Sequence, residues 1–215
     1  MDYIIMCGGY YENFETHKAL SIIDGEKLVE RTIRLLRENG IENIYISANN
    51  DYFDYLGLPI LKHENSYRYE NGKIHGYWVD AYYPYDKPCV YLHGDVYYSD
   101  NAIKKIVNYN ACYNTFIGNE IARNKEHKNW GEPFGYIVVN QPAFKDGIRL
   151  VKEMQDSGYL ERGYGISWEL YRVLNGLDPN KMYIYDNTYL SIDDETSDID
   201  EPWQIKELDE RVSCL

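Results

Sequence analysis

Short apolar runs alternate with amphipathic segments along the whole chain, and this alternation most constrains its fold. The run YIIM (residues 3–6) stops at two glycines, as expected of a buried parallel strand. Residues 26–39 (EKLVERTIRLLREN) place leucine and isoleucine side chains near one face, and Gly40 follows as a C-cap, so a helix is predicted. The run NIYISA (43–48) then predicts a second strand, which completes a β-α-β unit.

The same alternation continues to the C-terminal end. Further strands are predicted at 58–61, 88–95, 114–119, 135–140 and 181–185, and further helices at 73–83, 101–109, 142–156, 167–175 and after Pro202. No repeat or low-complexity linker divides the chain. We therefore predict one domain over residues 1–215, a three-layer α/β/α fold of Rossmann-like type with a mostly parallel central sheet.

The charge of the chain excludes one class of partner. A formal net charge of −13 argues against nucleic acid, which is bound through clustered lysine and arginine. It does not exclude a small phosphorylated ligand, because a divalent cation reverses the local sign.

Location and assembly are constrained less directly. No apolar run is long enough to span a membrane, so no membrane partner is expected. The four cysteines are scattered and contain no C-x-x-C pair, which indicates reduced thiols and a cytoplasmic protein. The 24 tyrosines leave two interpretations open, a subunit interface in a homodimer or ordinary half-buried rings on strands and helices.

Three predicted parallel strands deliver small or polar residues to one edge of the sheet. They end in CGG (7–9), ANN (48–50) and HGD (93–95). Ligands of open α/β sheets bind outside the carboxyl ends of the strands, so a cleft is expected there. Taken singly, a Gly-Gly pair is usually a turn and an Asp after a strand is often a helix cap. Asp95 is less easily explained as a cap, because Ser99 and Asp100 are better placed to cap the next helix.

Four segments resemble the nucleotidyltransferases that transfer a nucleoside monophosphate to a sugar phosphate or a related acceptor. IIMCGGYYENFETHKALSIIDGEKLVERTIRLLRENGI is similar to the signature of that family, and YISANNDYFDYLGLPIL resembles the molybdenum cofactor guanylyltransferase branch. YLHGDVYYS is closer to the Gly-Asp metal motif of the sugar-phosphate members, and DIDEPWQIKEL resembles the Asp-x-Asp-x-Pro segment of cytidylyl-transferring members. The resemblance implies a GT-A-like nucleotidyltransferase fold.

The resemblance also implies an activity and a catalytic centre. An NTP, with CTP weakly favoured by the Asp-x-Asp-x-Pro segment, would react with a phosphorylated acceptor in sugar nucleotide biosynthesis and release pyrophosphate. Lys18 would neutralise charge on the phosphates, and Asp95 would bind Mg²⁺. Asp200 would complete the metal site, with Asp198 as its substitute.

Nucleotide and acceptor contacts follow from the same resemblance. Cys7, Gly8 and Gly9 would form the turn whose backbone approaches the phosphates, and Asn49 would contact the nucleoside. His75 and Gly76 fall where such enzymes meet the base or ribose. The segment NWGEPFGYIVVN would cross the acceptor side of the cleft, with contacts from Trp130, Glu132 and Tyr136, although Trp130 fits plain packing equally well.

The sequence departs from the family at the glycine loop, where GGYYENF lacks the usual further glycine and arginine. Either another cation compensates, with Arg123, Lys125 and Lys128 as candidates, or nucleotide binding has been lost. Two alternative functions therefore stay open: a glycosyltransferase of related fold and a catalytically degenerate binding protein. A glycosyltransferase typically carries an Asp-x-Asp after a central strand, whereas this chain carries Gly94-Asp95.

Overall fold

Seven strands form the central sheet of the computed structural model, which describes residues 1–9, 12–120 and 131–213. The strand order is β12-β10-β11-β8-β1-β4-β5. The strands are β1 (Asp2–Met6), β4 (Ile44–Ala48), β5 (Ile60–Lys62), β8 (Cys89–His93), β10 (Thr115–Asn119), β11 (Glu132–Val138) and β12 (Tyr189–Ser191). Only β11 runs antiparallel to its neighbours β8 and β10, which confirms the mostly parallel sheet.

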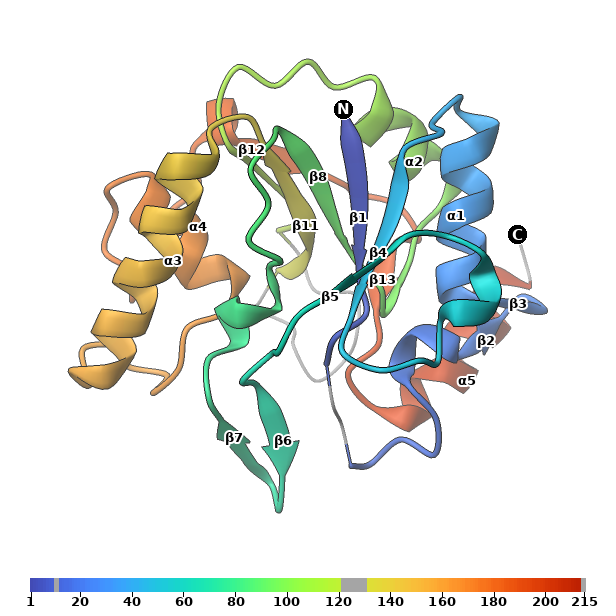
Figure 1. The fold of residues 1–215 in the computed structure, drawn as a ribbon, viewed down its shortest axis with the longest axis horizontal. Coiled ribbons are helices and arrows are strands. Elements are labelled where there is room, and N and C mark those ends of the chain that lie inside the picture. The colour runs from blue at the N-terminus through green and yellow to red at the C-terminus, as the bar shows by residue number, and fades with distance from the viewer. Residues whose placement is uncertain (10–11, 121–130, 214–215) are drawn as a thin grey trace.

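Helices cover both faces of this sheet, as the three-layer prediction requires (Figure 1). α1 (Leu28–Glu38) and α2 (Asp100–Val107) lie on one face, and α3 (Gln141–Asp156) and α4 (Ser167–Leu174) lie on the other. α5 (Pro202–Val212) packs beside the end of α1 and begins with Pro202 at its first turn, as predicted. None of the described helices is long and apolar enough to cross a bilayer.

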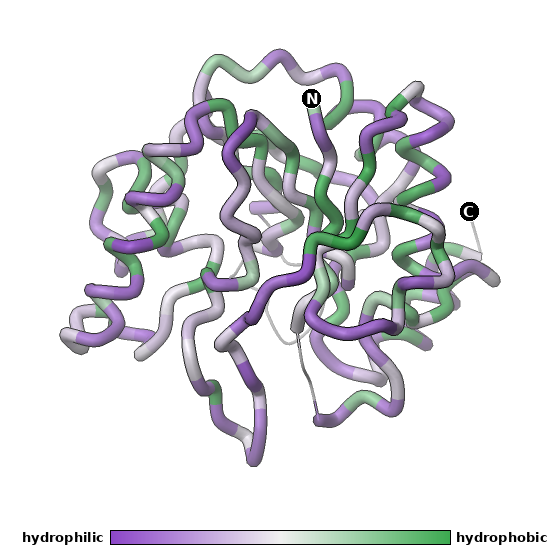
Figure 2. The backbone as a smooth tube through the Cα atoms, in the orientation of Figure 1, coloured by the Kyte–Doolittle hydropathy of each residue, from purple (hydrophilic) through white to green (hydrophobic). Residues whose placement is uncertain are grey.

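The two faces of the sheet bury different kinds of side chain. Beneath α1 and α2 the core is mostly aliphatic, with Ile33 and Ile103 packed against strand residues such as Ile46. Beneath α3 and α4 it is aromatic, and Tyr91 stacks on Phe144 at a centroid distance of 5.8 Å. Buried rings therefore account for part of the high tyrosine content. Figure 2 shows the hydrophobic residues concentrated in the central strands.

Short elements connect the layers, and the β6–β7 hairpin among them extends below the sheet in Figure 1. They are η1 (Lys18–Leu20), β2 (Ile22–Ile23), β3 (Glu26–Lys27), η2 (Asp54–Leu56), β6 (Arg68–Glu70), β7 (Lys73–His75), η3 (Trp78–Ala81), β9 (Val96–Tyr97), η4 (Asp186–Thr188) and β13 (Ser197–Asp198).

Two predicted elements are wrong. Residues 73–83 form strand β7 and the short η3 in place of a helix, because Asn71 and Gly72 adopt positive φ angles of 53° and 69° and turn the chain into the β6–β7 hairpin. Residues 181–185 form no strand, since the edge of β10 that such a strand would join is taken by β12.

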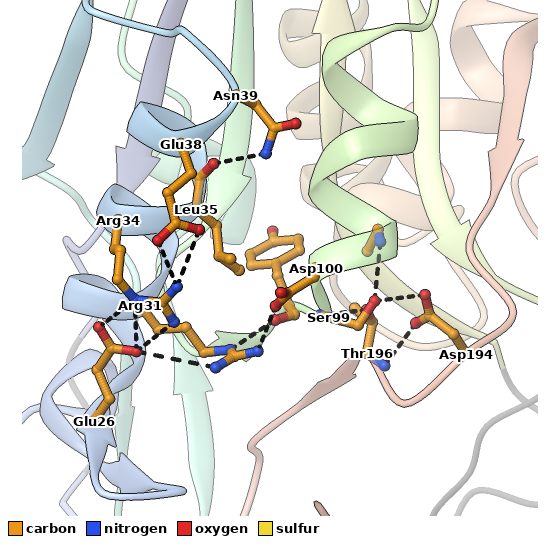
Figure 3. A network of polar contacts seen from close by, with 12 residues as sticks. Glu26, Arg31, Arg34, Leu35, Glu38, Asn39, Ser99, Asp100, Asp194 and Thr196 are labelled. Carbon is orange, nitrogen blue, oxygen red and sulfur yellow. Dashed lines mark hydrogen bonds and ion pairs between the residues drawn. The ribbon is translucent and has the colours of Figure 1, made fainter. Parts of the chain in front are cut away.

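A polar network ties α1 to the start of α2 and to the segment before β13 (Figure 3). The buried Arg31 donates from Nε to the Tyr98 carbonyl at 2.9 Å and pairs through Nη2 with Asp100 Oδ1 at 3.0 Å. Ser99 caps α2 as expected, accepting from Ala102 N, and its hydroxyl donates to Asp194 Oδ2 at 2.6 Å. The network therefore fixes the chain on both sides of α2.

Replacing Arg31 by methionine is expected to lower the free energy of unfolding by about 2–3 kcal/mol, because the buried Tyr98 carbonyl and Asp100 lose their donor. Urea unfolding measures this change. Arg37→Met is the matched control, since Arg37 lies exposed on the same helix and should change stability by less than about 0.5 kcal/mol. Equal effects of the two substitutions would show that the network contributes no stability.

Candidate active site

A two-stranded ladder brings distant acidic residues together. β9 follows Asp95 directly and pairs antiparallel with β13, so that Asp198 lies opposite Val96. The ladder continues through the Ile199 N–H, which donates to the Asp95 carbonyl at 3.0 Å. Asp95, Asp198 and Asp200 consequently share one region at the end of β8.

Lys18 lies between two of these carboxylates. Its Nζ is 3.5 Å from Asp95 Oδ2 and 3.6 Å from Asp200 Oδ1, and its side chain is only 1% exposed. The short η1 that carries Lys18 is capped by His17, whose Nδ1 accepts from Ala19 N at 3.2 Å. The structure thus joins the three residues that the sequence placed in the catalytic centre, Lys18, Asp95 and Asp200.

Burial and charge act in opposite directions on Lys18. Burial lowers the pKa of its ammonium group, but the charges of Asp95, Asp200 and Asp198 outweigh that effect and raise the pKa above its ordinary value. Lys18 is therefore charged at neutral pH. An ammonium held in this way supplies a fixed positive charge to an anionic ligand.

Burial and the neighbouring acids act in the same direction on the pKa of Asp198. Burial raises the pKa of its carboxyl well above the ordinary value, and the charges of Asp200, Glu132 and Asp95 raise it further. Its Oδ1 is buried and accepts no hydrogen bond from the described residues. A cation that reached Asp198 would relieve this repulsion.

Burial shifts the pKa values of the other nucleophilic or basic groups near the ladder toward their uncharged forms. Burial lowers the pKa of His17 and of His93, although the charge of Asp95 opposes it in both. Burial and the charge of Asp95 raise the pKa of the Cys7 thiol well above its ordinary value. At neutral pH the two histidines are therefore uncharged and Cys7 is a thiol, so none of these three residues supplies a charged group.

A large cleft opens over this cluster. Its volume is about 800 Å³, within the range of ligand pockets, and it adjoins a small cavity of about 40 Å³ at the glycine loop. The small cavity is lined by Gly8, Gly9 and Lys18. Both cavities share Tyr67, Trp78, His93 and Asp95, so they form one continuous site.

Glycine is required where the loop after β8 approaches β1. A Cβ on Gly94 would lie 2.6 Å from the Cys7 sulfur and 2.6 Å from the Met6 carbonyl oxygen. The Gly94 N–H instead donates to that carbonyl at 3.0 Å. This close approach places Asp95 beside the Cys7–Gly9 turn.

The other nucleotide-binding predictions lie outside the cleft lining. Asn49 is exposed and lines neither cavity. His75 and Gly76, at the end of the β6–β7 hairpin, are also exposed and line neither cavity, although Tyr69 and Ile74 of that hairpin line the large cleft. The β6–β7 hairpin extends below the sheet in Figure 1. It contributes Tyr69 and Ile74 to the cleft, whereas the predicted residues His75 and Gly76 do not line it.

The acceptor predictions divide three ways. Glu132 lines the cleft and is 4% exposed. Tyr136 lies in the aromatic core against Phe116 and Phe144, fully buried, so its predicted contact with an acceptor is wrong. The register between β10 and β11 shifts at a point between Glu132 and Tyr136, so the regular alternation of side chains along β11 is interrupted there. Trp130 lies outside the described residues, as do the candidate compensating cations Arg123, Lys125 and Lys128.

Several cleft residues were missed at the level of sequence. They are Tyr67, Trp78, Arg162, Tyr164 and Trp168. None follows a strand of the central sheet, which was the signal that located the acidic residues. Tyr67, Arg162 and Tyr164 lie in loops, Trp78 in the short η3 and Trp168 in α4, and no sequence pattern shows that these positions face the cleft.

The donor set suits a hard divalent cation. Within the described residues, no group of three or more His, Cys, Asp or Glu side chains is arranged to hold a metal. Mg²⁺ keeps several waters and takes one or two carboxylates together with substrate phosphates, however. Asp95 and Asp200, which face the same ammonium group, and the buried Oδ1 of Asp198 are ligands of the required type.

A family comparison agrees with this site. The model of the MobA-like NTP transferase domain matches residues 3–136, more than half of the chain. The chain belongs to this family. It is a nucleotidyltransferase, as the resemblance of its motifs implied. The sequence matches none of the curated proteins with which it was compared.

Solved structures share the fold of this nucleotidyltransferase at low identity. The CTP:phosphocholine cytidylyltransferase of Streptococcus pneumoniae is 14% identical with a TM-score of 0.61, and 98% of each chain is covered. A Bacillus anthracis protein described as a glucose-1-phosphate thymidylyltransferase is 13% identical with a TM-score of 0.62, covering 100% of this chain and 96% of that one. The inositol-1-phosphate CTP transferase of T. maritima is 14% identical with a TM-score of 0.57, covering 99% and 96%.

The raised pKa of Asp198 makes folding stability fall as the pH rises from 3.8, the ordinary pKa of aspartate, because the folded state binds the proton more tightly. Asp198→Asn removes this loss. We expect the variant in EDTA at neutral pH to melt roughly 2–4 °C above the parent, and the difference to vanish as the pH approaches 3.8.

Calorimetry across this pH range measures the difference. Asp51→Asn, at an exposed carboxylate, is the control and should leave the melting temperature unchanged. A destabilised Asp198→Asn protein at neutral pH would contradict the electrostatic explanation.

Proposed function

We propose that this nucleotidyltransferase transfers a nucleoside monophosphate from an NTP to a small phosphorylated acceptor in a Mg²⁺-dependent reaction, with residues 1–215 as the catalytic unit. The observation that carries the proposal is the buried Lys18 ammonium group held between Asp95 and Asp200 at the edge of a ligand-sized cleft. This arrangement offers a fixed cation and two hard oxygen ligands where phosphates would lie.

The reaction needs positioning more than covalent chemistry. An oxygen of the acceptor phosphate attacks the α-phosphorus of the NTP and forms a new P–O bond. The bond from the α-phosphorus to the bridging oxygen of the β-phosphate breaks, and pyrophosphate leaves with that electron pair. Both reactants are anions, so the site must hold them in line and neutralise charge. No serine or cysteine nucleophile is needed, in keeping with the raised pKa of the Cys7 thiol.

Residues of this chain can be given roles in that step. Lys18 neutralises charge that builds on the phosphates, and its raised pKa keeps it protonated through the reaction. Backbone groups of Gly8 and Gly9, which line the small cavity, approach the phosphates. Mg²⁺, held by Asp95 and Asp200 with Asp198 as a further ligand, would supply charge neutralisation at the phosphate oxygens when bound.

The substrates are proposed more specifically than the family alone allows. The similar structures are named as enzymes that act on phosphocholine, glucose 1-phosphate and inositol 1-phosphate, and two of them are named for CTP. These names and the Asp-x-Asp-x-Pro segment at Asp198–Pro202 support CTP as the first donor to test.

Location and assembly are part of the proposal. The free thiols of Cys7, Cys89 and Cys112 support a cytoplasmic location. Tyr113, Tyr159 and Tyr183, whose rings are largely exposed, are candidates for a homodimer interface.

Asp95→Asn is expected to lower pyrophosphate release by about 100-fold or more, because the site loses a hard anionic ligand while keeping its shape. A coupled pyrophosphate assay with each of the four NTPs and a panel of phosphorylated acceptors measures the change. Asp86→Asn is the matched control, since Asp86 pairs with Lys145 on the surface and lies outside the cleft. Retention of full activity by Asp95→Asn would remove Asp95 from the mechanism.

The assay also separates the two alternatives. A glycosyltransferase would release a nucleoside diphosphate from a nucleotide sugar, with no pyrophosphate. A degenerate binding protein would show NTP-induced thermal stabilisation without turnover in the parent protein or in either variant.

Metal dependence is tested by removing divalent cations. We expect EDTA to abolish pyrophosphate release and excess Mg²⁺ to restore it, because two anions must otherwise approach among several carboxylates. NTP should also raise the melting temperature by roughly 2–4 °C with Mg²⁺ present and by less in EDTA. Full activity in EDTA would refute the assignment of Asp95 and Asp200 as metal ligands.

A further inference from the structure

His17 lies next to Lys18 at the glycine turn, and one nitrogen of its ring is buried without a hydrogen bond. The ring lines the small cavity together with Gly8, Gly9 and Lys18. Its Nε2 makes no hydrogen bond with any residue that the structure describes. A buried donor with no acceptor is unfavourable, and an oxygen atom that enters the cavity would relieve it.

A backbone hydrogen bond fixes which nitrogen of the ring carries the proton. The Ala19 N–H donates to His17 Nδ1 at 3.2 Å, so Nδ1 is the unprotonated nitrogen. Burial lowers the pKa of His17 and outweighs the charge of Asp95, which raises it. The neutral ring therefore carries its single proton on Nε2, and this makes Nε2 a donor.

The surroundings of the ring direct this donor toward the glycine turn. The ring lies edge-on to the fully buried Phe53 at a centroid distance of 5.0 Å, and to Tyr52 at 6.5 Å. The carbonyl groups of Cys7 and Gly9 lie close enough to the ring to oppose the fall in the pKa of His17, yet Nε2 makes no hydrogen bond to either. Because Nδ1 faces the backbone of η1, Nε2 is the nitrogen that faces the turn.

The small cavity has the size and the polar lining that phosphate oxygens need. Its volume of about 40 Å³ accepts roughly three oxygen-sized groups, which is too little for a base or a sugar. Lys18 supplies a positive charge at the same wall. The amide of the buried Asn65 is already engaged, since Nδ2 donates to the Gly8 carbonyl at 3.3 Å and Oδ1 accepts from Tyr67 N at 2.9 Å. The ring of His17 therefore adds a donor that is still available.

We propose that His17 is a phosphate-binding residue, whose Nε2–H donates to a phosphate oxygen of the NTP at the glycine turn. The inference rests on the proposed nucleotidyl transfer and adds a neutral donor to the charged Lys18. The residues between Gly9 and His17 (YYENFET) include no lysine or arginine, so this segment offers a phosphate no charged donor. Because the ring is neutral, the nearby Asp95 does not pair with it as an ion, and the donor stays available to the ligand.

Two substitutions separate the two nitrogens of the ring. His17→Asn keeps an acceptor near the position of Nδ1, where it can still cap η1, and removes the distal donor. His17→Gln places an amide N–H near the position of Nε2. We expect His17→Asn to raise the dissociation constants of CTP and of inorganic tripolyphosphate, both with Mg²⁺, by at least about 10-fold, the factor that about 1.4 kcal/mol produces. His17→Gln should raise them by about threefold or less.

Calorimetric titration of the full chain measures these constants, and tripolyphosphate makes the result independent of the base. Lys104→Gln is the control, since Lys104 is exposed on α2 and lines neither cavity, and it should leave both constants unchanged. In His17→Asn the KM for CTP should rise, while the KM for the acceptor changes by less than about twofold, because the donor contacts the NTP alone. A ring that only supported the loop would lower the melting temperature and leave the affinities unchanged.

The imidazole of the parent protein reports the contact directly. In protein labelled with ¹⁵N at histidine, the ring that contacts Phe53 should show an unprotonated Nδ1 and a protonated Nε2 in NMR spectra. Tripolyphosphate with Mg²⁺ should move the Nε2 proton downfield, as a hydrogen bond to an anionic oxygen does. This measurement needs no variant, so it decides the inference even if His17→Asn fails to fold.

The outcomes separate the inference from the activity on which it rests. Unchanged dissociation constants in His17→Asn, equal losses in His17→Asn and His17→Gln, or an Nε2 proton that tripolyphosphate does not shift would each overturn the inference and leave nucleotidyl transfer standing. Absence of pyrophosphate release with every NTP and every acceptor overturns nucleotidyl transfer itself. Titration with tripolyphosphate still decides the inference in that case, because it requires no turnover, and a parent protein that binds neither CTP nor tripolyphosphate refutes it.

Discussion

Burial of one ammonium group constrains how the segments around the site are arranged. A lysine that is almost fully removed from water requires opposite charges at close range, or it would lose its proton. Asp95 and Asp200 meet that requirement from segments far apart in sequence, and the β9–β13 ladder holds those segments side by side. Removing either acid would take away one of the two carboxylates that pair with Lys18, so the glycine loop, the end of β8 and the C-terminal segment depend on one another.

The ladder is in turn held by residues 98–100 at the start of α2. The Ser99 hydroxyl donates to Asp194, and the Ser99 backbone N–H donates to the Thr196 hydroxyl. These two hydrogen bonds fix the chain just before β13. Arg31 of α1 binds the Tyr98 carbonyl and Asp100, one residue on either side of Ser99. The position of Asp198 and Asp200 therefore depends on the polar contacts between α1, the start of α2 and the segment before β13, which Figure 3 shows, as well as on the β9–β13 ladder.

The rule that ligands bind at the carboxyl ends of parallel strands predicted the region of Asp95 and of the Cys7–Gly9 turn, because strand ends are visible as apolar runs that stop. The same patterns failed where local chemistry overrode periodicity. Asn71-Gly72 forms a hairpin turn directly before the segment 73–83 that was predicted to be a helix. The register shift between β10 and β11 falls between Glu132 and Tyr136, so the two side chains have different surroundings. Trp78, Arg162 and Trp168 reach the cleft from loops or a helix remote from the motifs, and only the folded chain brings them there.

A negative cleft is a difficult place for two phosphorylated substrates, and this difficulty is the physical reason why the proposed reaction needs a metal. A triphosphate cannot enter among these carboxylates on the strength of Lys18 alone, since that ammonium group is already shared by two acids. Mg²⁺ held by Asp95 and Asp200 would reverse the sign of the local charge where the phosphates would lie, and its influence falls with distance from those two residues.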